Sequence, residues 1–142
     1  MSLPLAGVRV VEIGQEIQGP FAGLLLGDLG ADVIKIENRT TGDLSRWALA
    51  GRGSTDVPNH DVSPYFIAMN RGKRSITLDL KRTEAIEVVK RLAARADVVL
   101  TNYRPGVLDR LGIGFEGLKE ANPKIVFTPR RSCSNAATTG PR

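Results

Sequence analysis

The sequence has few of the residues that build disulfide or metal-bound scaffolds. Its 142 residues include one cysteine and one histidine, Cys133 and His60. A single cysteine excludes an internal disulfide and a multi-cysteine metal site, and one histidine does not supply a histidine-rich centre. Neither residue has a partner at the spacing of a catalytic motif. We therefore expect no bound metal and no nucleophile–histidine pair.

Long apolar runs are also missing. No run approaches the roughly 20 residues that a helix needs to cross a bilayer. The first residues, MSLPLAG, lack the charged and long apolar regions of a signal peptide. The composition, with 42% hydrophobic and 25% charged residues, is ordinary for a folded domain with a real core. These features predict a cytoplasmic protein without a membrane partner.

A nucleic-acid partner is not expected, although the formal net charge is +5. Residues 128–142 hold three of the 20 basic residues and no acid, which leaves 17 bases against 15 acids elsewhere. Aromatic residues make up only 5% of the chain, and no basic face with interleaved aromatics is visible. The basic balance is weak evidence for small anionic ligands.

The first part of the chain predicts a parallel βαβ unit. Two apolar strands, 8–13 and 32–37, flank a helix expected over 20–29, and such units have right-handed crossovers. Pro20 suits the first turn of a helix, and Gly30 suits the position after its end. The apolar residues at helical spacing, expected to face the core, are Phe21, Leu24, Leu25 and Leu29.

The rest of the chain continues the alternation after an irregular connection, 38–64. Further strands are expected over 75–80, 97–100 and 124–127, and helices over 83–96, 105–111 and 115–121. Thr83 is a candidate cap for the first of these helices. The fold class is therefore α/β, with a Rossmann-like parallel sheet and flanking helices. Residues 1–127 form this domain, and residues 128–142 are an atypical polar, basic tail.

Three loops follow predicted strands and should meet at the carboxyl edge of the sheet, where such folds bind ligands. They span residues 14–19, 38–46 and 102–106. Their polar side chains include Gln15, Gln18, Arg39, Arg46 and Arg104. Guanidinium groups and helix N-termini bind phosphate oxygens, so this set suits an extended phosphate-bearing ligand. Solvated loop arginines are an equally good interpretation of the pattern alone.

A dinucleotide-binding site is the main alternative that the sequence pattern offers. Glu37 follows the first glycine turn by about the 20 residues at which an acid holds a ribose hydroxyl in such folds. However, Gly14, Gly19 and Gly23 do not match the G-x-G-x-x-G spacing, and no phosphate-binding G-K-[ST] follows. Glu37 is then only a polar strand end. The NRGKR turn at 70–74 is more typical of a solvated charge cluster than of a binding site, and a binding role is the alternative.

Four blocks of sequence resemble the N-terminal part of the family III CoA-transferases. They are the run PLAGVRVVEIGQEIQGPFAGLLLGDLGADVIKIE, the pair GD followed by Arg46, the run NRGKRSITLDLK, and the run ADVVLTNYRPGVLDRLGIG. The resemblance covers residues 4–127, with the blocks in the family's order. This family includes carnitine CoA-transferase, formyl-CoA transferase and the 2-methylacyl-CoA racemases.

The resemblance implies an enzyme that moves coenzyme A between acyl thioesters and carboxylic acids, its small-molecule partners. Full-length members are interlocked homodimers, and the transferases use an acylated aspartate. The racemases instead use a histidine and an aspartate to move a proton. A non-catalytic CoA- or nucleotide-binding module is a further alternative. The catalytic aspartate is expected beyond Arg142, so we expect this chain by itself to be an inactive fragment.

The resemblance also assigns roles to single positions. Gln18 and Gly19 match the segment near the reacting thioester. The positions that match contacts to the CoA nucleotide and phosphates are Arg39, Lys73, Arg74, Asn102, Tyr103 and Arg104. Together these eight residues are the predicted CoA site.

Overall fold

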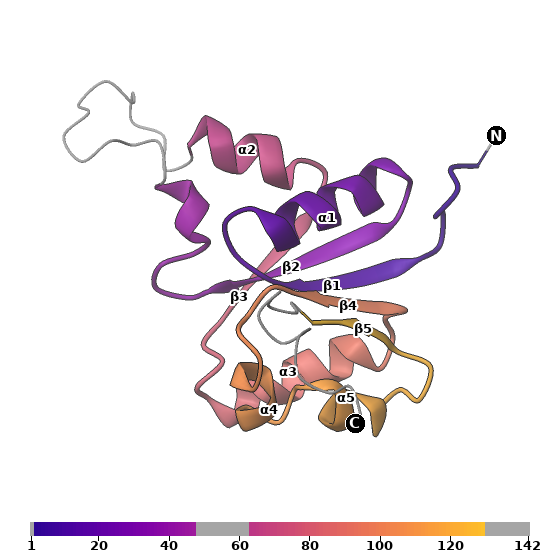
Figure 1. The fold of residues 1–142 in the computed structure, drawn as a ribbon, viewed down its shortest axis with the longest axis vertical. Coiled ribbons are helices and arrows are strands. Elements are labelled where there is room, and N and C mark those ends of the chain that lie inside the picture. Colours follow the sequence, from indigo (N-terminus) through magenta and orange to yellow (C-terminus); the bar gives the residue numbers. More distant parts are fainter. Residues whose placement is uncertain (1, 48–62, 130–142) are drawn as a thin grey trace, which may run out of the picture.

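A computed structural model describes residues 2–47 and 63–129 of the chain (Figure 1). His60, Cys133, part of the irregular connection and nearly all of the predicted tail lie outside the described residues. The sequence-based statements about those segments therefore stay predictions.

The described elements alternate between strands and helices, as the sequence predicts. In chain order they are β1 (Arg9–Ile13), α1 (Gln18–Asp28), β2 (Asp32–Asn38), the short 3-10 helix η1 (Leu44–Arg46), α2 (Pro64–Asn70), β3 (Arg74–Leu78), α3 (Thr83–Ala93), β4 (Val98–Thr101), α4 (Val107–Arg110), α5 (Phe115–Lys119) and β5 (Val126–Thr128). The strands form one parallel sheet in the order β3-β2-β1-β4-β5. Helices α1 and α2 cover one face, and α3, α4 and α5 cover the other (Figure 1). The predicted fold class is confirmed.

Strand β1 lies at the centre of the sheet and is covered on both faces, as its apolar sequence predicts. Successive side chains alternate between the faces. Val10 packs in a cluster with Leu26 of α1, whereas Val11 packs in a second cluster that includes Val89 of α3. Val10, Val11 and Val89 are at most 2% exposed. The loops that follow β1 therefore start from a rigid base.

The ends of α1 agree with the sequence, but its orientation does not. Pro20 lies in the first turn, and Gly30 has a φ of 103°, which suits a glycine after a helix end. Of the predicted core-facing residues, only Leu24 is buried; the exposed ones, at 46–47%, are Phe21, Leu25 and Leu29. The face towards the sheet carries small residues instead, including the buried Gly19 and Gly23. Because α1 is apolar on nearly every side, spacing alone did not identify the inward face.

Two further differences from the predicted elements concern the first residues of helices α2 and α3. Helix α2 begins inside the stretch predicted as irregular, because Ser63 accepts a hydrogen bond from the Phe66 amide and Pro64 occupies the first turn. Thr83 is the first residue of α3 rather than its cap, a position that Arg82 occupies. The other predicted elements are present with ends shifted by a few residues. None of the described helices is long and apolar enough to cross a membrane.

The orientation of α1 can be tested with two neighbouring leucines. Leu24→Ala should lower the free energy of unfolding by about 2–5 kcal/mol, since it leaves a cavity beneath the helix. Leu25→Ala removes the same atoms from a side chain that is 47% exposed, and it should change stability by no more than about 0.5 kcal/mol. Urea unfolding of both variants measures the difference. Equal losses would contradict the orientation described above.

Candidate functional site

The three predicted loops meet at the carboxyl edge of the sheet. The amide of Gln15 donates to Asn102 Oδ1 at 3.0 Å, and the amide of Glu16 donates to Asp43 Oδ1 at 3.0 Å. These bonds join the loop after β1 to the loops after β4 and β2. Strands β2 and β3 lie on one side of β1, and strands β4 and β5 lie on the other. The carboxyl end of β1 is therefore the switch point, the place at which open α/β sheets bind ligands.

A pocket of about 450 Å³ lies at this point. Its lining consists of Gln15, Glu16, Asn102, Tyr103, Arg104 and Val107. A second pocket, of about 300 Å³, shares Tyr103 and Val107 with the first and extends past the ends of β2 and β3 to Lys81 and Arg110. We call the two pockets together the edge groove. Charged side chains of both signs line it: the basic ones are Lys81, Arg104 and Arg110, and the acidic ones are Glu16, Glu37 and Asp79.

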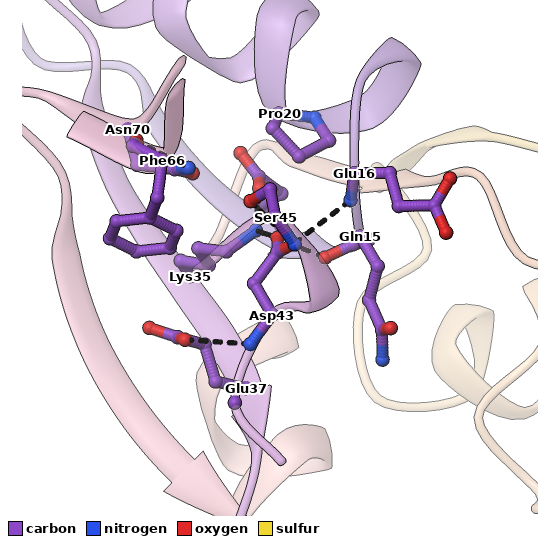
Figure 2. A network of polar contacts seen from close by, with 12 residues as sticks. Gln15, Glu16, Pro20, Lys35, Glu37, Asp43, Ser45, Phe66 and Asn70 are labelled. Atoms are coloured by element: carbon purple, nitrogen blue, oxygen red, sulfur yellow. Dashed lines mark hydrogen bonds and ion pairs between the residues drawn. The ribbon is translucent and has the colours of Figure 1, made fainter. Parts of the chain in front are cut away.

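Beneath α1, the sheet carries charges where an apolar core would be expected. Glu12 and Lys35 face each other across β1 and β2, and both are at most 1% exposed. Lys35 Nζ lies 2.7 Å from Glu12 Oε1, 2.7 Å from Asp43 Oδ2 and 3.0 Å from the Gly14 carbonyl oxygen (Figure 2). Lys35 therefore donates hydrogen bonds to Glu12 and to the Gly14 carbonyl, and it forms an ion pair with Asp43.

Lys73 completes this charged cluster from the turn before β3. Its Nζ lies 2.8 Å from Glu12 Oε2, and it donates to the Pro20 carbonyl at 2.7 Å and to Asn70 Oδ1 at 3.0 Å. Burial lowers the pKa of Lys73, and the nearby Glu12 carboxylate offsets this only in part. We call Glu12, Lys35, Asp43 and Lys73 the buried ion cluster; its two acids and two bases balance in charge.

Asp43 links this cluster to the loop after β1. Its Oδ1 accepts hydrogen bonds from the Ser45 amide at 2.8 Å, from the Ser45 hydroxyl at 2.7 Å and from the Glu16 amide. Burial alone would raise the pKa of Asp43, but the bonds from Lys35, Glu16 and Ser45 lower it below its usual value. Asp43 is therefore held as a carboxylate.

Glu37, predicted to be only a polar strand end, is buried and paired. It is 3% exposed, and Arg46 donates to both carboxylate oxygens, at 2.8 and 2.9 Å. Ser75 adds a bond at 2.6 Å. Burial would raise the pKa of Glu37, but Arg46 and Ser75 lower it overall, and Glu37 in turn raises the pKa of Arg46. Because both groups are occupied, Glu37 is a poor ribose ligand and Arg46 a poor phosphate ligand.

Four of the eight predicted site residues lie together. Asn102, Tyr103 and Arg104 line the edge groove, and Gly19 packs against Asn102, whose Cγ would lie 3.2 Å from an added Cβ. Gln18 is exposed at the first position of α1.

The other three predicted residues are placed differently. Arg39 is exposed in the turn after β2. Lys73, predicted to lie in a solvated turn, points inward and has a side chain only 2% exposed. Arg74 bonds Asp32 at 2.9 Å and lines a separate cavity of about 340 Å³, together with Arg9 and Arg95. The structure thus places Arg74 in different surroundings from Asn102, Tyr103 and Arg104.

The sequence reasoning missed the buried ion cluster and the second pocket. A usable signal was present, because Glu12 and Lys35 each interrupt an otherwise apolar strand at matching positions of the βαβ unit. Arg110 and Lys81 gave no such signal, since each sits among other charged surface residues. In the described ranges, 2–47 and 63–129, no group of three metal-binding side chains is present.

Comparison with known proteins identifies the family. The model of CoA-transferase family III matches residues 5–132. The chain belongs to CoA-transferase family III. It is 42% identical over 139 residues to a succinate–glutarate CoA-transferase of Agrobacterium fabrum, and 44% identical over 126 residues to a formyl-CoA:oxalate CoA-transferase of Afipia carboxidovorans. The resemblance noted in the sequence is therefore confirmed.

Solved structures agree with this family assignment. A CAIB/BAIF family protein from Brucella suis superposes with a TM-score of 0.80 at 44% identity, over 91% of this chain and 33% of that protein. The two enzymes named above are matched over 97% and 89% of this chain but only 34% and 28% of their own lengths. The chain thus spans about a third of the length of these relatives.

Gly23 provides a test of the buried ion cluster. A Cβ at this position would overlap Glu12 Oε2. Lys73 holds this oxygen and Lys35 holds the other oxygen of the same carboxylate, so Gly23→Ala should cost about 1–3 kcal/mol. Gly27, one turn later in α1, is the matched control, because its Cβ would lie 3.6 Å from Val33 Cγ2. Gly27→Ala should raise stability by up to about 1 kcal/mol. Thermal and urea unfolding measure both changes, and a neutral Gly23→Ala would refute the close approach of α1 to Glu12.

Proposed function

We propose that the chain binds acyl-CoA in the edge groove, as the N-terminal part of an enzyme that transfers CoA between thioesters and carboxylic acids. The observation that carries this proposal is the groove itself, which lies at the switch point of the sheet and is lined by Asn102, Tyr103 and Arg104. Family membership supports CoA as the ligand, because the matched relatives are named as CoA-transferases.

The shape and charge of the groove suit CoA. CoA is extended, with a nucleotide that carries phosphates at one end and a thioester at the other. Two neighbouring pockets, of about 450 and 300 Å³, share Tyr103 and Val107 as lining residues, so one ligand could extend across both. The exposed Arg104 and Arg110 can each form paired bonds to phosphate oxygens. The loop after β1, with Gln18 and Gly19 beyond it, would then lie at the thioester end.

We assign this chain the binding step rather than the whole reaction. We expect the acylated aspartate beyond Arg142, as the family resemblance implies. The chain spans 34% and 28% of the lengths of the two named relatives, which supports this assignment. A 2-methylacyl-CoA racemase would use the same CoA site, so the groove does not separate the two reactions. A homodimer and a cytoplasmic location belong to the same proposal. A dinucleotide enzyme is disfavoured, because Arg46 and Ser75 occupy the Glu37 carboxylate.

Calorimetric titration and thermal unfolding of the purified chain test CoA binding. CoA and acetyl-CoA should bind in the titration and raise the melting temperature in the unfolding experiment, and NAD should do neither. Arg104→Ala should weaken CoA binding by about 1.5–3 kcal/mol, the range for a hydrogen bond to a charged group. Arg74→Ala is the matched control, because Arg74 pairs with Asp32 away from the groove, and it should leave affinity unchanged.

The two arginine variants distinguish the edge groove from the cavity beside Asp32. A loss of affinity with Arg74→Ala and none with Arg104→Ala would move the phosphate site to that cavity. Stabilisation by NAD alone would reject CoA as the ligand. In a transfer assay with succinyl-CoA and a dicarboxylic acid, the chain by itself should show no CoA exchange. Exchange above background would place the catalytic group among the residues of this chain.

A further inference from the structure

Three consecutive residues of the loop after β1 are held in place by side chains from other parts of the fold. Each bond joins a backbone group of the loop to a side chain from β2, from the turn after β2 or from the loop after β4. The pairs are Gly14 carbonyl with Lys35 at 3.0 Å, Gln15 amide and carbonyl with Asn102 at 3.0 and 2.7 Å, and Glu16 amide with Asp43 at 3.0 Å. The backbone that lines the edge groove is thus fixed from several directions.

The conformation of Glu16 explains why such support is needed. Its φ is 65°, the only positive φ at a non-glycine residue in the part of the chain that the structure describes. A residue with a Cβ enters this region at an energetic cost and stays there only where its surroundings hold it. The bond from the Glu16 amide to Asp43 is one such restraint.

Asp43 can act as a restraint because it is itself immobilised. It is fully buried, and its second oxygen lies 2.7 Å from Lys35. Lys35 in turn is held by Glu12, and Glu12 is held from its other side by Lys73. A bond from an amide to a carboxylate is about twice as strong as one to a neutral acceptor. The buried ion cluster therefore ends in a strong acceptor aimed at the loop (Figure 2).

We propose that Asp43 is a positioning residue for ligand binding: through the Glu16 amide it holds the loop Gly14–Glu16 in the shape that forms the edge groove. This inference rests on the proposed CoA binding. Gln15 and Glu16 line the groove, and Gln15 also donates to the Tyr103 hydroxyl at 3.2 Å. A loop that is already in place loses less conformational freedom when the ligand binds, so affinity is higher.

A purely structural role for Asp43 is the competing explanation. In that case the buried ion cluster would only stabilise the domain, and any variant of equal stability would bind CoA equally well. Ser63→Ala supplies the comparison, because the Ser63 hydroxyl donates to the Ser45 carbonyl at 2.6 Å and caps α2 but does not contact the loop. It should cost roughly 0.5–2 kcal/mol of stability.

The experiment compares Asp43→Ala, Asp43→Asn and Ser63→Ala in two measurements. The first is hydrogen exchange of the Glu16 amide, with the buried Val99 amide as a monitor of global folding. Both Asp43 variants should speed exchange at Glu16 relative to wild type while Val99 stays protected. The second is CoA affinity: Asp43→Ala should weaken it on the order of tenfold. Asp43→Asn, which keeps an acceptor oxygen without the charge, should fall between, and Ser63→Ala should match wild type.

The link to Glu16 can be isolated with a double-mutant cycle. Glycine adopts a φ of 65° without the cost that a Cβ imposes, so a loop with Glu16→Gly needs less help from Asp43. Asp43→Ala should therefore weaken CoA binding less in the Glu16→Gly background than in the wild-type background. Equal losses in the two backgrounds would show that Asp43 does not act through residue 16.

The measurements distinguish a failure of the proposed CoA binding from a failure of the positioning role of Asp43. If wild type does not bind CoA, the proposed function fails, and hydrogen exchange at Glu16 still decides whether Asp43 holds the loop. If Glu16 remains protected in a folded Asp43 variant, the positioning role is wrong. The same conclusion follows if Asp43→Ala and Ser63→Ala weaken CoA binding equally. If Asp43→Ala does not fold, Asp43→Asn provides both measurements.

Discussion

The ion pair between Glu12 and Lys35 is the constraint on which the rest of the structure depends. Removing two opposite charges from water is costly, and their attraction compensates only when every remaining hydrogen-bonding position is satisfied. The fold supplies hydrogen-bonding groups from distant segments, including the Pro20 carbonyl and Asn70 for Lys73. Glu12 Oε2 and Asp43 Oδ2 are held by ion pairs with Lys73 and Lys35 rather than by hydrogen bonds. The cluster therefore ties α1, α2 and the turn after β2 to the centre of the sheet.

This arrangement divides the face beneath α1 into two halves. Near the amino ends of β1 and β2 the face is apolar, with Val10 and Val33 packed against the helix. Near the carboxyl ends it is charged, with Glu12 and Lys35. The apolar half holds the helix on the sheet, and the charged half reaches the loop from which the groove is built. Stability and ligand recognition are thus served by adjacent parts of one layer.

The sequence predicted the features that depend on local pattern. Apolar strands, the βαβ unit, the glycine after α1 and the meeting of the three loops all follow from periodicity and parallel topology. It did not predict which face of α1 is buried, because α1 is apolar on nearly every side and periodicity does not record that Gly23 lies against Glu12. The partners of Lys73 were equally hidden, since they come from residues 3 to 61 positions away in the chain.

The close approach of α1 to the sheet at Gly23 also has an evolutionary consequence. The missing side chain at position 23 makes the space that the Glu12 carboxylate fills, and that carboxylate neutralises Lys73. A change at any one of these three positions leaves a clash, a void or an unpaired charge at the others. The energetic cost of a substitution at position 12, 23 or 73 should therefore depend on the residues at the other two positions, so that these sites are expected to change in a correlated way.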